Sequence, residues 1–263
     1  MKDILITGAY GGMGRAAALL LRERGYRVFA LDRRVAEPEE NIIPIEVDVT
    51  SEDSVRAAAK KVGEYTESLY AIIHFAGIYM LDSLVEMTSE EFRRIFDVNM
   101  YGVFLINREF KPFLRQGSKI LITTSELAPL DPLPFTGIYA VTKAALDKYA
   151  YSLRMELQLL GITVSVLRAG AVETGMLGVS TTALDRFCEK TELYTCNADR
   201  FKSIVNGVES RSVPPTKIAE KTAKIIAKSK PKFAYSINRN PLLLLLNALP
   251  KRIQLFAIRL ILR

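Results

Sequence analysis

Short apolar runs alternate with longer amphipathic stretches along most of the chain. The runs have the length of strands, and the stretches between them place apolar residues at helical spacing. The predicted strands are 4–6, 28–31, 42–47, 69–75, 120–124, 163–167 and 233–237, and the predicted helices are 13–24, 55–65, 89–114, 139–160 and 216–228. Strands that alternate with helices favour right-handed βαβ units. We therefore expect an α/β fold with a doubly wound parallel sheet between two helical layers.

The alternating pattern weakens in two places. Residues 175–212 form short mixed stretches, which we interpret as a loop over the active site. Residues 241–263 combine a leucine run with basic residues, and Pro250 divides them. No linker or repeat breaks the chain before about residue 240, so we expect one domain over residues 1–240. A helical extension would follow over residues 241–263.

The residue content excludes several classes of chemistry. His74 is the only histidine, which rules out histidine triads and sites built from several histidines. Cys188 and Cys196 match no zinc or redox spacing, so we expect two reduced thiols and no metal. The N-terminus shows no basic leader or signal-type apolar stretch, which favours a cytoplasmic location.

A glycine-rich turn joins the first predicted strand to the first predicted helix. Glycines there allow the backbone to approach a pyrophosphate, and the helix N-terminus offers free N–H groups. The turn supplies the candidate dinucleotide-binding residues Gly8, Tyr10, Gly11, Gly12, Met13 and Gly14. A turn of this kind between a strand and a helix indicates a dinucleotide-binding Rossmann fold.

The ends of the next two strands bear on the choice of cofactor. Asp32 can accept hydrogen bonds from the adenosine ribose and would repel a 2′-phosphate, whereas Arg33 and Arg34 could bind that phosphate. We favour NAD, with NADP as the alternative. Asp48, after the third strand, is placed to reach the adenine edge.

Tyr139 and Lys143 lie four residues apart on a predicted helix, so their side chains share one face. An ammonium near a phenol lowers the phenol pKa and suits it for proton transfer. The pair alone is common on solvated helix faces. Ser125, at the end of the fifth strand, would add a hydroxyl at the same edge of the sheet, where ligands bind.

Together these motifs resemble the short-chain dehydrogenase/reductase family over roughly residues 2–237. The resemblance rests on the Thr7–Gly14 turn, Asp48-Val49, Phe75-Ala76-Gly77, Asn99, Ser125, Tyr139-x-x-x-Lys143 and Gly170-x-x-x-Thr174. It implies that Tyr139 is the general acid/base and that Lys143 holds the nicotinamide ribose and lowers the Tyr139 pKa. Ser125 would bind the substrate oxygen, and Asn99 would kink its helix and hold a water in a relay to Lys143.

The resemblance also implies a wider set of cofactor contacts. Thr174 would contact the nicotinamide carboxamide or the pyrophosphate, and the backbone of Val172 would face the nicotinamide ring. The catalytic residues Asn99, Tyr139 and Lys143 would also contact the cofactor. The remaining cofactor-binding residues would be Gly8, Tyr10, Gly11, Gly12, Met13, Gly14, Asp32, Arg33, Asp48, Val49, Ala76, Gly77 and Gly170.

Three positions depart from the family pattern. His74-Phe75 replaces the usual pair of asparagines, and we expect His74 to be a packed residue rather than a catalyst. Ala169 replaces the usual proline before Gly170. Ser125 stands 14 residues before Tyr139, one more than the commonest spacing, and we attribute the extra residue to the loop 129–134.

The expected activity is hydride transfer between a nicotinamide and a hydrophobic secondary alcohol or ketone, resembling a steroid, retinoid or lipid. Candidate apolar pocket residues in 175–212 are Met176, Leu177, Phe187, Tyr194 and Phe201. The alternatives are a catalytically silent dinucleotide-binding regulator and a membrane-associated scaffold. Family members often pair through the helices that carry Asn99 and Tyr139, so a homodimer or homotetramer is expected.

The C-terminal segment is the basic part of the chain. Ten of the 36 basic residues follow Glu220, and no acidic residue does, so the charge does not suggest a nucleic-acid partner. On a helix that begins at Lys251, Arg252, Arg259 and Arg263 would lie within about 40° of one another. The helix could pack across the substrate cleft or a subunit interface. It could instead lie on the inner face of an anionic membrane, although it is too short to span one.

Overall fold

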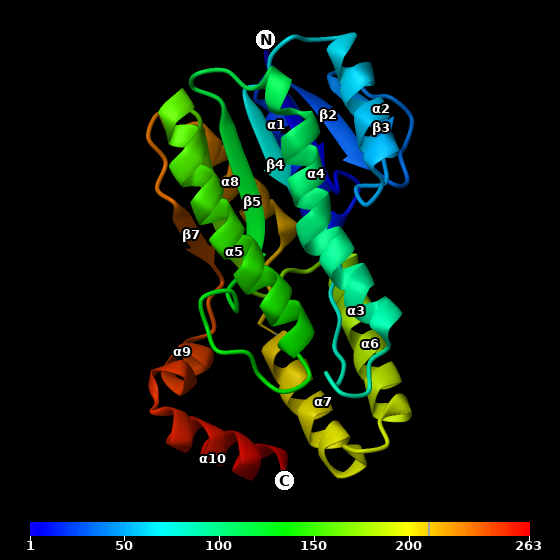
Figure 1. Ribbon diagram of the computed structural model, residues 1–263, viewed down its shortest axis with the longest axis vertical. Coiled ribbons are helices and arrows are strands. Elements are labelled where there is room, and N and C mark those ends of the chain that lie inside the picture. Colours follow the sequence, from blue (N-terminus) through cyan, green and yellow to red (C-terminus); the bar gives the residue numbers. More distant parts are fainter. Residues whose placement is uncertain (210) are drawn as a thin grey trace.

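A parallel sheet forms the centre of the computed structural model (Figure 1). The structure describes residues 1–209 and 211–263, and the side chains of all of these except 175–182, 206, 208 and 209. Within them, the strands are β1 (Lys2–Thr7), β2 (Tyr26–Asp32), β3 (Ile42–Glu46), β4 (Ala71–His74), β5 (Lys119–Ser125), β6 (Thr163–Ala169) and β7 (Ala234–Ile237). Their order is β3-β2-β1-β4-β5-β6-β7. The order reverses between β1 and β4, and ligands of doubly wound sheets bind at such a reversal.

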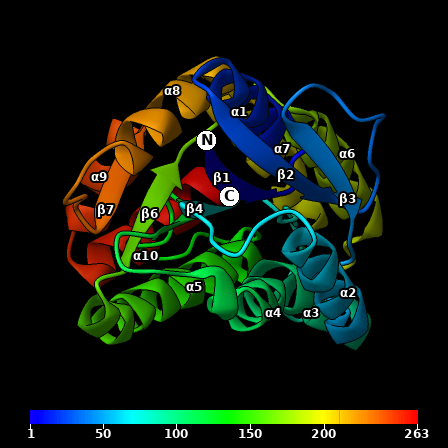
Figure 2. The ribbon, with the colours of Figure 1, turned by 90° about the horizontal axis from the view of Figure 1, so that it is seen from above.

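The alternation of side chains along β1 explains the two helical layers. Leu5 belongs to the core on one face of the sheet, whereas Ile4 and Ile6 belong to the core on the other. The first face is covered by α2 (Glu52–Gly63), α4 (Gly102–Glu109) and α5 (Gly137–Leu157), and the second by α1 (Gly12–Glu23) and α8 (Pro215–Ile226) (Figure 2). The predicted doubly wound α/β fold is therefore confirmed.

The predicted helix 89–114 is not continuous. It consists of α3 (Ser89–Phe96), a π-helical turn (Asp97–Tyr101), α4 and a 3₁₀ turn (Lys111–Phe113). Thr88 caps α3 in a capping box with Glu91, and Ser51 caps α2 by accepting a hydrogen bond from the Ser54 amide.

The prediction of loose, mixed structure over residues 175–212 is wrong. This segment forms two helices, α6 (Gly175–Lys190) and α7 (Thr195–Glu209). Both extend beyond the end of the sheet (Figure 1). Their contact residues, including Leu184, Phe187 and Phe201, form a separate small core with Leu81 and Phe135. Because this core is small, the helices need only a narrow apolar stripe, which the sequence pattern does not reveal.

Two short helices end the chain, α9 (Pro241–Ala248) and α10 (Lys251–Leu262), and α10 begins where the sequence predicts. They lie at the same end of the molecule as α6 and α7 (Figure 1). Within the described residues, no helix has both the length and the apolar character needed to cross a membrane. Cys188 and Cys196 are free thiols.

Candidate active site

The glycine-rich turn between β1 and α1 packs against the neighbouring strand ends. Gly8 has φ +67°, and a Cβ on it would lie 2.6 Å from the Ala76 amide nitrogen. A Cβ on Gly14 would overlap the Gly8 carbonyl. A Cβ on Gly12 would lie 2.6 Å from the Thr174 Cγ2 atom. These contacts require glycine and bring Ala76 and Thr174 beside the start of α1, as the sequence predicts for one ligand cleft.

An open cleft extends from this turn across the ends of β2 and β3. The predicted residues that line it are Gly8, Tyr10, Gly11, Gly12, Met13, Gly14, Asp32, Arg33, Arg34, Asp48, Val49, Ala76, Gly77 and Thr174. Asp32 accepts hydrogen bonds from the Tyr10 amide at 2.9 Å and the Arg33 amide at 2.8 Å. Asp48 accepts hydrogen bonds from the amide and hydroxyl of Thr50, which lower its pKa. The cleft thus combines free N–H groups at a helix N-terminus with a fixed carboxylate, the donors and acceptors that fit a dinucleotide.

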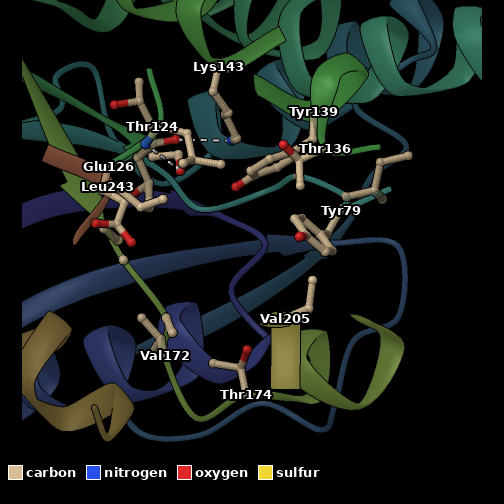
Figure 3. Close-up of a pocket in the computed structure, with 18 of the residues that line it drawn as sticks. Tyr79, Thr124, Glu126, Thr136, Tyr139, Lys143, Val172, Thr174, Val205 and Leu243 are labelled. Carbon is tan, nitrogen blue, oxygen red and sulfur yellow. Dashed lines mark hydrogen bonds between the residues drawn. The ribbon is translucent and has the colours of Figure 1, made fainter. Parts of the chain in front are cut away.

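Ser125, Tyr139 and Lys143 line a second cavity of about 220 Å³ beyond the ends of β5 and β6 (Figure 3). Ser125 is the last residue of β5, and Tyr139 and Lys143 lie on the first turns of α5. The Lys143 Nζ donates a hydrogen bond to the Thr123 carbonyl at 3.3 Å and lies 5.7 Å from the centroid of the Tyr139 ring. The structure therefore brings Ser125, Tyr139 and Lys143 into one cavity, as the sequence predicts.

The pKa values of this group are set by burial. Burial raises the pKa of Tyr139 to about 12, and a hydrogen bond with Ser125 offsets part of this increase. Burial also lowers the pKa of Lys143 to about 8. The expected lowering of the Tyr139 pKa by Lys143 is not found: burial raises this pKa, and the Lys143 ammonium is directed at the Thr123 carbonyl.

Asn99 lies in the π-helical turn between α3 and α4, and it is buried. Its side chain donates to the Ile78 carbonyl and the Thr142 hydroxyl and accepts from the Ile78 amide. A Cβ on Gly77 would lie 3.2 Å from the Asn99 Oδ1 and 3.5 Å from the Lys143 Nζ. Asn99 is thus close to Lys143, and the irregular turn agrees with the expected kink.

The cavity and the cleft share a wall. Met13, Phe75, Gly77, Ile78 and Thr174 line both, so the two spaces adjoin at these residues. Gly170 and Val172, which follow β6, line the cavity and not the cleft. The site therefore consists of an open cleft, lined by the predicted dinucleotide-binding residues, that adjoins a smaller cavity containing the tyrosine, lysine and serine.

A family model described as short chain dehydrogenase matches residues 2–185. The chain belongs to the short-chain dehydrogenase family. This agrees with the resemblance predicted from the sequence motifs, and it places the protein in a family of NAD(P)-dependent oxidoreductases.

Characterised relatives have varied names. The chain is 33% identical over 179 residues to the NADPH-dependent 1-acyldihydroxyacetone phosphate reductase of Schizosaccharomyces pombe. This match covers 66% of this chain and 60% of that protein. It is 27% identical over 262 residues to the 3-ketodihydrosphingosine reductase of Bacteroides thetaiotaomicron, and the match covers 97% of this chain and 96% of that protein. It is 31% identical over 191 residues to mouse estradiol 17-beta-dehydrogenase 2, of which it spans only 50%.

Solved structures share the fold at low sequence identity. A short-chain dehydrogenase from Streptomyces avermitilis superposes with a TM-score of 0.76 at 21% identity, covering 98% of this chain and 93% of that one. A short chain dehydrogenase from Burkholderia cenocepacia in complex with NADP gives a TM-score of 0.74 at 21% identity, with 98% of both chains covered.

Several residues that line the cavity were not predicted from the sequence, and three of them contact the reactive group or come from distant segments. Tyr79 packs edge to face on Tyr139, with ring centroids 4.7 Å apart. Glu126 is buried beside Ser125, accepts a hydrogen bond from the Asn240 amide at 2.6 Å, and has a pKa that burial raises. Leu243 enters the cavity wall from α9. The adjacency of Glu126 to Ser125 could have indicated Glu126, whereas Leu243 becomes visible only in the folded chain.

The apolar residues predicted for the pocket have different positions. Phe201 lines the cavity, with Ile204 and Val205 one turn further along α7. Phe187 and Tyr194 instead pack behind it around Phe135, so their assignment to the pocket is wrong. The side chains of Met176 and Leu177 lie outside the described residues.

His74, which departs from the family pattern, is a packed residue, as expected. It is buried at the end of β4, and its Nε2 lies 3.0 Å from the Asn107 Oδ1. Burial lowers the pKa of His74 to about 4, so the ring is neutral at physiological pH. Among the described residues, no group of three or more histidine, cysteine or acidic side chains is arranged to hold a metal.

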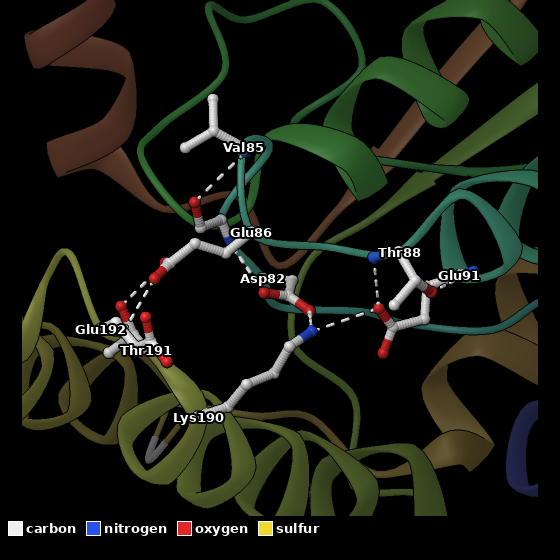
Figure 4. Close-up of polar contacts among 9 residues, drawn as sticks. Asp82, Val85, Glu86, Thr88, Glu91, Lys190, Thr191 and Glu192 are labelled. Carbon is white, nitrogen blue, oxygen red and sulfur yellow. Dashed lines mark hydrogen bonds and ion pairs between the residues drawn. The ribbon is translucent and has the colours of Figure 1, made fainter.

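A polar cluster attaches α6 and α7 to the segment before α3 (Figure 4). Lys190, at the end of α6, donates to Asp82 at 2.8 Å and to Glu91 at 3.2 Å. Glu86 accepts hydrogen bonds from the Thr191 hydroxyl and from the amides of residues 192 and 193. These contacts hold the turn between α6 and α7 in place, and with it the α7 side chains that line the cavity.

Proposed function

We propose that this protein transfers hydride between a nicotinamide cofactor and a hydrophobic secondary alcohol or ketone. The observation that carries this proposal is the convergence of Ser125, Tyr139 and Lys143 in a largely apolar cavity that adjoins the dinucleotide-shaped cleft. When bound, the nicotinamide accepts or supplies the hydride. The protein's own residues then manage the substrate oxygen and its proton.

Tyr139 is the proposed general acid/base. With a pKa of about 12 it is protonated at neutral pH, which suits it to donate a proton to a ketone oxygen during reduction. Ser125, which hydrogen-bonds Tyr139, is placed to hold the same oxygen. With its pKa of about 8, Lys143 is mostly charged at pH 7, and its ammonium would hold the nicotinamide ribose, the role that the family resemblance implies.

Asn99 is the proposed connection between Lys143 and solvent. The side-chain amide of Asn99 is fixed by three hydrogen bonds. Gly77, which has no side chain, lies between this amide and the Lys143 ammonium. A water molecule held there would return a proton to Lys143, as the family resemblance implies. The nucleotide contacts proposed from the sequence, including Gly170, Val172 and Thr174, complete the site.

The proposed substrate class follows from the cavity walls. Phe201, Ile204, Val205 and Leu243 are apolar and lie on helices that extend beyond the sheet. Relatives named for an acylated ketone phosphate, a ketosphingoid base and an estrogen support a hydrophobic substrate. A hydrophobic group on the substrate would pack against these side chains while its oxygen faces Tyr139.

We propose NAD as the cofactor. The Asp32 carboxylate is held at the end of β2 by two backbone amides and would repel a 2′-phosphate. Arg33 and Arg34 are exposed in the same cleft. They would favour NADP if their attraction for the 2′-phosphate exceeded the repulsion from Asp32. The ratio of kcat/KM for NADH to that for NADPH decides between them. We expect a ratio above one that Asp32→Ser reverses, and a native preference for NADPH would contradict this choice.

We also propose a homodimer or homotetramer in the cytoplasm. Phe104 and Tyr101 near α4, and Val141, Tyr151 and Met155 on α5, are exposed apolar side chains on neighbouring helices. A second copy would bury them in the pairing that the family resemblance implies. Sedimentation of the purified protein tests this assembly.

The catalytic proposal is tested by Tyr139→Phe. Loss of the acid/base group should lower kcat for reduction of a hydrophobic ketone by about 10²–10⁴-fold, with NADH binding by fluorescence unchanged. Tyr65→Phe is the matched control, since it removes a hydroxyl from an exposed tyrosine that lines neither the cavity nor the cleft and should change kcat by less than about threefold. Near-native turnover by Tyr139→Phe would remove Tyr139 from this role.

A further inference from the structure

The C-terminal helix α10 is oriented opposite to an ordinary surface helix. Within α10, all of which the structure describes, the one buried residue is Gln254, which is 5% exposed and hydrogen-bonds Asp131. Phe256 is 67% exposed and Leu260 is 62% exposed. A helix that packed on the protein by its apolar face would bury these two side chains instead. The solvent-facing side of α10 is therefore the side that a further partner would cover.

Basic residues border this apolar face. At about 100° per residue, Arg252, Arg259 and Arg263 occupy one stripe, and Phe256, Leu260 and Ile253 occupy the adjacent stripe. All six side chains are exposed. An apolar stripe beside a basic stripe on one helix is the arrangement of a helix that lies in a membrane interface.

Helix α9, which precedes α10, also exposes apolar side chains. Leu242 and Leu245 are exposed, whereas Leu243 between them points into the cavity. The position of α9 and α10 is fixed by the loop before α5. The Asp131 amide donates to Asn247 at 2.8 Å, and the Asp131 carboxylate pairs with Lys251. Helices α9 and α10 lie at the same end of the molecule as α6 and α7 (Figure 1).

We propose that this tail surface, formed by Leu242, Leu245, Ile253, Phe256, Leu260, Arg252, Arg259 and Arg263, docks on an anionic lipid bilayer. The apolar side chains would enter the boundary between headgroups and acyl chains, and the arginines would contact anionic headgroups. A second copy of the chain fits this surface poorly. A symmetric contact would bring the arginines of both copies together, and residues 221–263 contain no acidic residue to neutralise them.

Vesicle flotation tests this proposal with the full-length protein and needs neither cofactor nor turnover, so its result is independent of the proposed catalysis. The vesicles contain phosphatidylcholine with or without phosphatidylglycerol. We expect the protein to float with the anionic vesicles and to be released by high salt. The triple variant Arg252→Gln, Arg259→Gln, Arg263→Gln should lower the partition coefficient about 100-fold. Phe256→Ser with Leu260→Ser should lower it more than about tenfold.

Matched controls separate docking from general surface effects. Arg56→Gln, Lys60→Gln and Lys61→Gln remove three exposed charges from α2 and should change partitioning less than about threefold. Leu159→Ser with Leu160→Ser removes two exposed leucines after the far end of α5 and should leave flotation unchanged. Unchanged melting temperatures and NADH fluorescence would show that the tail variants remain folded.

Three results would overturn the proposal. The first is failure of the native protein to float with anionic vesicles. The second is equal flotation of the native protein and both tail variants. The third is a native dimer in vesicle-free solution that Phe256→Ser with Leu260→Ser dissociates, without any vesicle binding. That last result would identify a second copy as the partner of this surface.

Discussion

Lys190 should hold the helices α6 and α7 against the body of the molecule. Its ammonium contacts two carboxylates on the segment before and within α3, Asp82 at 2.8 Å and Glu91 at 3.2 Å. The Asp82 side chain is only 8% exposed, so it is the more important of the two. We therefore expect Lys190→Met, which keeps most of the side-chain volume, to loosen the outer wall of the cavity.

The magnitude follows from the burial of each partner. Lys190 is 32% exposed, so solvent screens part of its charge, and the contact with half-exposed Glu91 contributes less than about 1 kcal/mol. A hydrogen bond to a buried charged group contributes about 1.5–3 kcal/mol. Asp82 retains its hydrogen bond from the Ser83 amide, which limits the loss. We expect Lys190→Met to lower the free energy of unfolding by about 1.5–2.5 kcal/mol.

Urea unfolding and hydrogen exchange measure this effect. A loss of this size should lower Tm by about 4–8 °C and increase exchange at the amides of residues 192–194. The control Arg56→Met removes the contact with Asp53, which is 92% exposed, and should change stability by less than about 0.5 kcal/mol. The reasoning is refuted if Lys190→Met matches this control, or if Lys190→Met is equally destabilising in an Asp82→Asn background.

The remaining predictions concern the glycine turn and the reactive lysine. Gly14→Ala would place a Cβ on the Gly8 carbonyl and should destabilise the protein by more than about 2 kcal/mol, whereas Gly11→Ala, whose Cβ would lie 3.4 Å from the same oxygen, should cost less than about 1 kcal/mol in thermal unfolding. The folded-state pKa of Lys143, about 8, is below its value of 10.5 in the unfolded chain, so the unfolded chain binds more protons between these values and stability should rise with pH there. Lys143→Met should therefore abolish turnover yet raise the free energy of unfolding at pH 7 by about 1–3 kcal/mol, with the gain shrinking toward pH 10 in urea titrations. A gain independent of pH would show that the buried charge is not its cause.

Local patterns predicted the parts of the site that lie on the sheet. The glycine turn, Asp32 and Ser125 each follow a strand with a clear apolar run, so their meeting at one sheet edge follows from the parallel order of the strands. Tyr139 and Lys143 were placed correctly because their four-residue spacing lies within a long helix. In each case, adjacent residues determine the position of the functional side chain.

The parts that were not predicted depend on distant contacts. The kink at Asn99 was expected only from the family resemblance, because its hydrogen bonds to Ile78 and Thr142 appear in no local pattern. Helices α6 and α7 were missed because their small core draws on Leu81 and Phe135 from elsewhere in the chain. The sequence predicted a lowered pKa for Tyr139 because the spacing of Tyr139 and Lys143 shows that they are neighbours. It does not show that both side chains are buried, and burial raises the pKa of Tyr139.

The two walls of the cavity differ in whether a substitution there would also affect cofactor binding. The inner wall includes Met13, Phe75 and Ile78, which also line the nucleotide cleft, so a substitution there would alter cofactor binding together with substrate choice. The outer wall contains Phe201, Ile204, Val205 and Leu243, all beyond the residues 2–185 that match the family model. Because none of these four residues lines the nucleotide cleft, substitutions there should change substrate choice with less effect on cofactor binding. Libraries aimed at new substrates should therefore be directed at these four positions.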